Sequence, residues 1–185
     1  MNSKSETNIL PIGPLMIEHR LIERMVALIE RESAKMRDNH QVNIRLLDSA
    51  VDFFRFYADR CHHGKEEDIL FKALKTKTLV ATDKAMLEVL IAEHARARGL
   101  VGKLADGVEE ICKRHGSEAA KSITAIIEDL VRLYEGHIRK EDKQFFIPVM
   151  QYFSKQELSK MLCEFREFDR TLIHEKYKSV ISKFE

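Results

Sequence analysis

Two segments of the chain repeat a histidine that is followed four residues later by a glutamate. One segment carries His62 and Glu66, and the other carries His137 and Glu141. In both, a lysine precedes the glutamate, an acidic residue follows it, and a hydrophobic pair ending in phenylalanine comes shortly afterwards. Residues four apart lie on one face of a helix, so each segment can offer an imidazole and a carboxylate to one point. Two such segments facing each other in a helical core would form a two-metal site.

Helical periodicity covers the regions that must position these side chains. Glycine and proline are scarce, with 7 and 3 copies. Apolar residues recur at steps of three and four in four segments, at about residues 11–37, 41–74, 82–114 and 117–153. Short connections between long helices favour antiparallel neighbours, so the chain is predicted to be all-α, with an up-down-up-down four-helix bundle.

The chain is predicted to form one domain with extensions at both ends. Residues 1–8 are polar and are expected to be a flexible N-terminus, and residues 9–153 form the bundle. Ser154 and Glu157 have the spacing of a capping box, which predicts an additional C-terminal helix within residues 154–185. That amphipathic helix is expected to pack on the bundle, or on a protein partner or a second copy of the chain.

Composition narrows the possible partners and location. The formal net charge is +1 and no long basic stripe occurs, which argues against nucleic acid and anionic membrane as partners. No apolar run is long enough to span a bilayer, and the N-terminus lacks the apolar core of a signal peptide. Cys61, Cys112 and Cys163 are far apart and odd in number, which is typical of free thiols in a reducing compartment. A cytoplasmic protein is therefore expected.

Each of the four bundle helices places one histidine within its apolar stripe. These histidines are His19, His62, His94 and His137. Four imidazoles and the two glutamates would be costly in a dry core without partners, and a pair of metal ions offsets that cost. Nitrogen and oxygen ligands without thiolate suit iron or manganese, with zinc as a further possibility.

Several alternatives remain open at this point. Glu23 follows His19 at the same spacing, and Asp142 follows Glu141, so either could add a carboxylate ligand. His63 and Glu67 also share the spacing, but the match to the other segment favours their neighbours, and His63 is expected at the surface. The same surface position is expected for the remaining histidines, which are His40, His115 and His174. A metal-free helical interaction module is the alternative if the core histidines are merely satisfied polar residues.

With these pieces in place, the chain resembles the hemerythrin-like, or HHE cation-binding, family over about residues 9–153. The segments that carry the resemblance are 17–23, 62–71, 93–98 and 137–142. The family implies a four-helix bundle with a non-haem di-iron centre, bridged by an oxo or hydroxo group and two carboxylates. Manganese or zinc is then less expected than two iron ions. Carried over, the ligands would be His19, His62, Glu66, His94, His137 and Glu141, with the two glutamates as bridges.

One departure from the oxygen-carrying hemerythrins bears on function. Those proteins have a second histidine four residues after the one on the third helix, where this chain has Arg98, and their fourth helix uses an aspartate in the slot of Asp142. The pattern is closer to the four-histidine, two-glutamate type. That type implies a protein that binds or senses a small diatomic ligand such as O2 or NO, or handles iron. The alternative is a di-iron redox enzyme, acting as a peroxidase, an oxidase, an NO reductase or in iron-sulfur cluster repair; whether the chain is an enzyme stays open.

Overall fold

Four long helical rods form the body of the protein, as the sequence predicts. The computed structural model describes residues 10–39, 41–114, 117–170 and 173–185, and these contain helices but no strand. The first rod is α1 (Ile12–Asn39) and the third is α4 (Ala81–Arg114). The second rod joins α2 (Ile44–Phe53), η1 (Phe54–His63), η2 (Glu66–Phe71) and α3 (Lys72–Leu74), and the fourth joins α5 (Ser117–Lys140), η3 (Glu141–Phe145), α6 (Phe146–Val149) and η4 (Met150–Tyr152).

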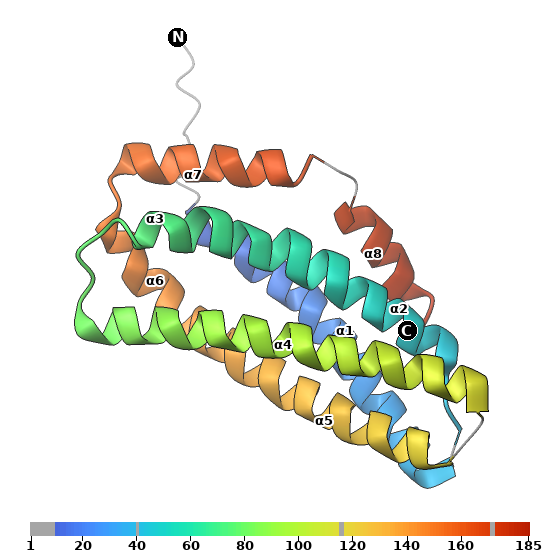
Figure 1. Cartoon of the computed structure of the whole chain (residues 1–185). Helices are drawn as coiled ribbons and strands as arrows, with labels where there is room; N and C mark the ends of the chain where they lie inside the picture. The colour runs from blue at the N-terminus through green and yellow to red at the C-terminus, as the bar shows by residue number, and fades with distance from the viewer. Residues whose placement is uncertain (1–9, 40, 115–116, 171–172) are drawn as a thin grey trace.

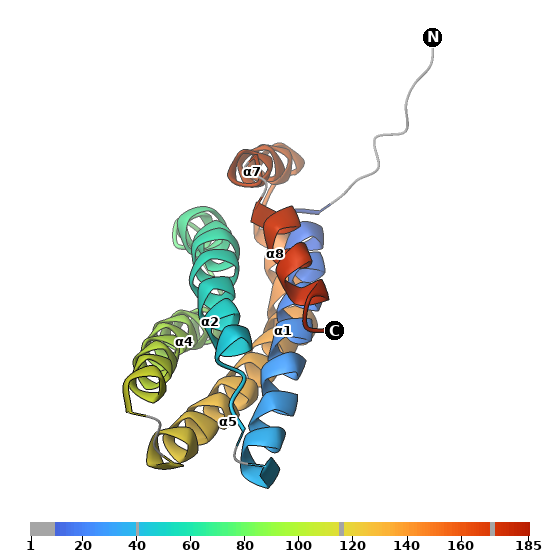
Figure 2. The ribbon, with the colours of Figure 1, turned by 90° about the vertical axis from the view of Figure 1, so that its right-hand side faces the viewer.

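The rods pack as an antiparallel, four-sided bundle, which confirms the predicted architecture. The first rod contacts the second and the fourth, and α4 contacts the same two rods from the opposite corner (Figures 1 and 2). Every rod therefore has two neighbours and can direct one stripe to the common centre. The expected flexible N-terminus at residues 1–8 lies outside the described residues.

Both His-x-x-x-Glu motifs lie where the helical turn widens. The segments η1, η2 and η3 are π-helical, and Glu66 and Glu141 are the first residues of η2 and η3. In a π-helix the backbone hydrogen bonds join residues five apart. Side chains four and five positions apart therefore both lie near the same face of the helix. Pro148 follows η3 and has no N–H to donate to the carbonyl of Gln144, which favours such a local rearrangement. Helical periodicity alone did not indicate these wider turns.

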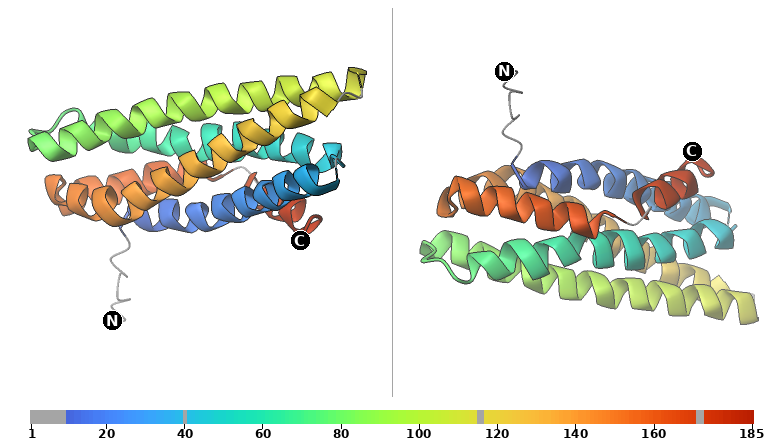
Figure 3. Two further views of the ribbon diagram at one scale, coloured as in Figure 1. Left: turned by 90° about the horizontal axis from the view of Figure 1, so that it is seen from below. Right: turned by 90° about the horizontal axis from the view of Figure 1, so that it is seen from above.

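The C-terminal segment differs from the single helix predicted for it. It forms two helices, α7 (Lys155–Phe168) and α8 (Ile173–Ser182). The predicted capping box of Ser154 and Glu157 opens α7. Figure 3 shows the two helices lying along the side of the bundle formed by the first two rods, where α7 packs on η2 and α8 packs on η1 and α1. An added Cβ on Gly64 would lie 3.3 Å from the ring of Phe168, so a small residue permits this close approach.

The break between α7 and α8 corresponds to a division of the hydrophobic core. Met161 and Phe165 of α7 join one cluster of buried apolar residues, while Tyr177 and Ile181 of α8 join another. The histidines and glutamates singled out by the sequence lie in neither cluster but in a polar layer between them. The C-terminal segment therefore forms two helices, one packed on each apolar cluster, on either side of the polar layer. A membrane-spanning helix is not found among the described residues.

Candidate metal centre

The six residues predicted as ligands come together in the middle of the bundle. All of them are buried, with exposures of 3% or less. Two sets of four side chains each place their ligand atoms within 4.8 Å of one another. The first set contains His19, His62, Glu66 and Glu141, and the second contains His63, Glu66, His94 and His137.

The two glutamates lie between the two pairs of histidines. One oxygen of Glu66 is 3.5 Å from Nε2 of His62, and its other oxygen is 3.4 Å from Nε2 of His94. Oε2 of Glu141 is 3.1 Å from Nε2 of His19 and 3.2 Å from Nε2 of His137. Each carboxylate thus faces one histidine from the first two rods and one from the last two, which is the arrangement that a bridging carboxylate requires.

Polar atoms that point into this space lack hydrogen-bond partners among the described residues. They are Nε2 of His19 and His62 and all four carboxylate oxygens of Glu66 and Glu141. Buried polar atoms without partners cost free energy, so such a group requires an explanation. Imidazole nitrogen and carboxylate oxygen are the donors that iron, manganese and zinc accept. The residues therefore fit a pair of metal ions, as the family resemblance implies.

A ring of four further carboxylates holds the histidines from behind. In each case Nδ1 of a ligand histidine donates to a carboxylate on a neighbouring rod: His62 to Glu18 at 2.8 Å, His94 to Glu67 at 2.7 Å, His137 to Glu93 at 3.0 Å, and His19 to Asp142 at 2.8 Å. Since Nδ1 carries the proton, Nε2 is left to face the centre. Such partners fix the orientation and tautomer of a metal-binding histidine.

Each carboxylate of this ring is also paired with a cation. Lys65 binds Glu18, Arg98 binds Glu67, Lys140 binds Glu93, and Arg20 binds Asp142. Burial opposes ionisation of Glu67, Glu93 and Asp142, yet hydrogen bonds from histidine and the adjacent cation lower the pKa of all three. These three carboxylates therefore stay ionised and keep their histidines oriented.

Without metal, protons compensate the charge of the central carboxylates. Burial by itself would lower the pKa of His19, but the hydrogen bond to Asp142 and the nearby charge of Glu141 outweigh it and raise that pKa to about 10. Burial likewise would lower the pKa of His94, but Glu66 and Glu67 outweigh it and raise that pKa to about 9. For Glu66, burial is outweighed by His62 and His94, which lower its pKa. Metal binding would release these protons.

His63 is not at the surface, contrary to the prediction. It is buried, and its ring stacks on that of His94 with centroids 3.8 Å apart. Burial, followed by the charge of His94 and of the other nearby histidines, lowers the pKa of His63 well below its ordinary value, which keeps its ring neutral. The wide turns of η1 bring it into the second group of ligand atoms, with His94 and His137.

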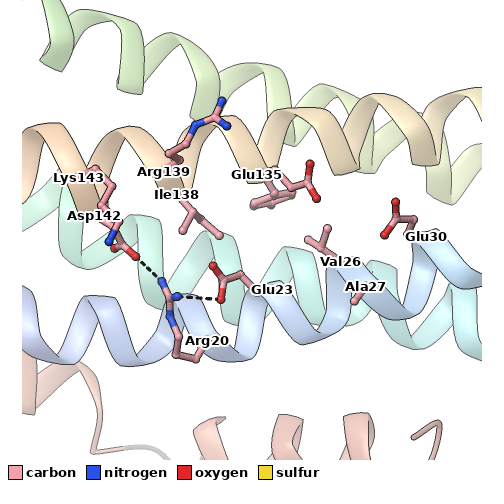
Figure 4. A pocket seen from close by; sticks show the side chains of 11 residues that line it. Arg20, Glu23, Val26, Ala27, Glu30, Glu135, Ile138, Arg139, Asp142 and Lys143 are labelled. Atoms are coloured by element: carbon pink, nitrogen blue, oxygen red, sulfur yellow. Dashed lines mark hydrogen bonds and ion pairs between the residues drawn. The ribbon is translucent and has the colours of Figure 1, made fainter.

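The structure also places the two carboxylates that the sequence left open. Glu23 is 43% exposed and pairs with Arg20 rather than with the central cluster. Asp142 lies behind His19 and binds its Nδ1, so it supports a ligand in this structure instead of facing the centre. Figure 4 shows Arg20 between these two carboxylates, on the wall of a groove between α1 and α5.

The other histidines occupy different surroundings. His174, expected at the surface, is only 24% exposed and contacts Asp169 at 2.8 Å and the Tyr57 hydroxyl at 3.0 Å. Asp169 also accepts a hydrogen bond from Lys65 at 2.6 Å, which links the end of α7 to the ring of carboxylates. His40 and His115 lie outside the described residues. Of the cysteines, Cys61 is buried, Cys112 and Cys163 are exposed, and all three are free.

The sequence reasoning missed the supporting carboxylates, although a signal for them was present. Glu18 directly precedes His19, and Glu93 directly precedes His94, so the first and third helices share a Glu-His pair. The acidic residues directly after Glu66 and Glu141 supply the other members of the ring, Glu67 and Asp142. Each of these carboxylates serves a histidine on the next helix, which a pattern within one helix does not reveal.

Comparison with known proteins agrees with this geometry. A family model described as the hemerythrin HHE cation binding domain matches residues 10–149. Searches of curated proteins and of solved structures gave no match. The matched span covers the four rods of the bundle, apart from η4 at the end of the fourth, and every ligand candidate at its centre. The chain therefore belongs to the hemerythrin HHE cation-binding domain family.

Proposed function

We propose that the buried cluster holds two iron ions and that the protein uses them to bind or sense a small diatomic ligand, O2 or NO, or to handle iron. The observation that supports this most strongly is the group of unpartnered buried atoms shared by two histidines and two glutamates. Iron is preferred to manganese or zinc on the family resemblance alone. A ferrous pair would supply electrons and an open coordination position to such a ligand.

The protein's own residues would orient the metal ligands and limit the contact of the metal ions with water. His19 and His62 would serve one metal ion, His94 and His137 the other, with Glu66 and Glu141 shared. His63 would add a neutral nitrogen to the second ion. Phe146 stacks on His19 and Phe71 stacks on His94, so an apolar ring lies against one histidine of each pair and limits its contact with water.

Metal content per chain tests this proposal directly. Protein purified without oxygen should contain about two iron ions per chain, as expected for a di-metal site. Glu66→Gln should lose most of that iron, because one shared carboxylate serves both positions. Little metal in the wild type, with the fold intact and no uptake of added ferrous iron, would refute the proposal and favour a metal-free helical interaction module.

A buried carboxylate elsewhere in the bundle provides the matched control. Glu32 is 3% exposed and accepts a hydrogen bond from the backbone N–H of Asn43 at 2.6 Å, away from the central cluster. Glu32→Gln makes the same chemical change as Glu66→Gln in a similarly buried setting. It should retain iron, so a loss in both variants would indicate a general effect on folding.

Turnover distinguishes a binding protein from a redox enzyme. With a reductant and O2, NO or peroxide supplied in excess, a carrier or sensor would bind the ligand without consuming it. Sustained consumption would identify an enzyme instead. The cytoplasmic location, and a protein partner or second copy at the C-terminal helices, remain predictions from the sequence.

A further inference from the structure

A cavity beside the second pair of histidines extends from the rim of the bundle to His63. It has a volume of about 270 Å³ and lies between η1, α4 and α5. His63 is the member of the ligand cluster that lines it, and the ring of that residue stacks on His94. The cavity therefore ends directly at one side of the proposed metal centre.

The chemistry of the walls selects the kind of molecule that this cavity accepts. Phe54, Ala97, Val101 and the ring of Tyr134 form most of its surface. Burial raises the pKa of Tyr134, so the phenol stays neutral. Besides Arg98, the charged residues of the lining are Arg55, which is exposed, and Asp59, which is already bound by Arg98. An ion would therefore lose its hydration against the apolar part of the walls, which is costly. The volume of about 270 Å³ is also below the range of about 300–1,000 Å³ found for drug-sized ligands, which favours a molecule of a few atoms.

The outer rim is closed by charged side chains rather than by backbone. Arg98 donates to Asp59 and to Glu67, both at 2.7 Å, and the Arg98 side chain is 41% exposed. Arg98 occupies the position where the oxygen-carrying relatives have a further histidine. In this chain that position therefore lies at the mouth of the cavity, where a flexible side chain can move aside.

The opposite side of the centre offers a contrasting environment. Behind His62, the Glu18 and Lys65 side chains are 4% and 0% exposed, and Lys65 binds Asp169 at the end of α7. The groove between α1 and α5 reaches Asp142, which supports a ligand from behind (Figure 4). The cavity at His63 is thus the one, among those described, that meets a member of the ligand cluster.

From these observations we infer that the cavity at His63 is the access route through which a small uncharged molecule, such as O2 or NO, reaches the metal centre. Arg98 and Gly102 lie at its mouth. This inference rests on the proposed function and adds to it a route, a side of approach and a selectivity for uncharged ligands.

Gly102 provides a way to close the cavity without disturbing the bundle. A Cβ added there meets nothing within 4 Å, and leucine forms helices better than glycine does. Gly102→Leu should therefore fold and fill the mouth. Gly99→Leu is the matched control, because it makes the same change on the same helix at an exposed position with equally open space.

The first measurement uses the metal-free protein and xenon, an uncharged probe that enters apolar cavities. Crystals of the wild type and of Gly99→Leu under xenon pressure should show xenon beside His63, and crystals of Gly102→Leu should not. Absence of xenon from the cavity in the wild type would overturn the inference. This result does not depend on iron.

The second measurement is the association rate of NO with iron-loaded protein, followed by stopped flow. Gly102→Leu should slow association by about tenfold, as expected when binding must await an opening motion, while Gly99→Leu should leave it unchanged. An unchanged rate in Gly102→Leu with xenon excluded would overturn the route but not the proposed function. If wild-type iron protein takes up no NO or O2, the proposed function fails, while the xenon result still decides whether the cavity admits such molecules.

Discussion

The two halves of the candidate metal centre are supported by the same kinds of contact but differ in how deeply the supporting lysine is buried. In the first half, Glu18 orients His62 and is bound by Lys65; in the second, Glu93 orients His137 and is bound by Lys140. The Lys65 side chain is fully buried beneath the C-terminal helices, whereas that of Lys140 is 30% exposed.

A second difference lies beside the paired histidines. His62 is followed by His63, while His137 is followed by Ile138, so one half of the repeat carries an additional imidazole. That imidazole does not lie with the first pair of histidines but stacks on His94 of the adjacent rod α4. The comparison shows that a repeated motif supplied equivalent candidate ligands, while the surroundings of the two halves differ in burial and in the cavity that His63 lines.

The largest expected effect concerns a feature that the halves share, the proton that each holds without metal. The pKa values of His19 and His94 are raised to about 10 and about 9 from an ordinary 6.5. A histidine whose pKa is raised in the folded state stabilises the protein. This stabilisation is complete when the pH is below the pKa of the unfolded state, and it is lost as the pH rises through the pKa of the folded state. Metal-free protein should therefore lose several kcal/mol of unfolding free energy between about pH 7 and 10, since one pKa unit corresponds to about 1.4 kcal/mol.

Urea unfolding across this pH range measures the loss. His19→Gln should flatten the dependence, because one of the two raised groups is removed. Stability that does not change with pH would contradict the shared protonation. Metal affinity should show the opposite trend and increase with pH, since ligands bind metal in their deprotonated form.

The two lysines test whether burial is what separates the halves. Lys65→Met leaves Glu18 and Asp169 without their shared cation in a buried setting, which should cost about 3–5 kcal/mol of unfolding free energy. Lys140→Met breaks the equivalent pair nearer to solvent and should cost less than about 1 kcal/mol. Urea unfolding of metal-free variants compares them, and equal losses would show that the difference in cover has no energetic consequence.

His63 tests whether the additional imidazole acts through its nitrogen or through its ring. His63→Phe keeps an aromatic ring against His94 but removes the nitrogen donors. If His63 supports the second metal ion, the affinity of that ion should fall by about 10- to 100-fold while the first is retained. Anaerobic calorimetric titration with ferrous iron resolves the two steps, and two unchanged steps would assign His63 a packing role alone.

Asp169 tests how the C-terminal helices are fastened over the first half. Asp169→Asn weakens the contacts to Lys65 and His174 and should cost about 1.5–3 kcal/mol of unfolding free energy, as for hydrogen bonds to charged groups. Hydrogen exchange should then increase in α8 more than in the bundle. Glu167→Gln is the control, because this side chain is 67% exposed and bonds only Arg170 among the contacts described here. Equal exchange in both variants would show that Asp169 does not fasten the helices.

The sequence by itself determined the helices and the types of side chain that gather at the buried centre. Apolar spacing predicted four bundle helices, and the histidines within those stripes predicted six buried ligand candidates, which the structure brings together. The capping box at Ser154 marked the start of α7. These features are local, because the face on which a side chain lies depends on its neighbours three and four residues away.

Only the tertiary structure decided what lies around that centre. Each supporting carboxylate serves a histidine on a different rod, and that pairing depends on how the rods are rotated and placed in register. His63 is buried because the wide turns of η1 and the position of α4 bring it against His94. The C-terminal segment is divided into α7 and α8 because the two core clusters that it covers are separated by the polar layer. Spacing along one helix sets a direction, whereas contacts between helices are settled only when the whole core packs.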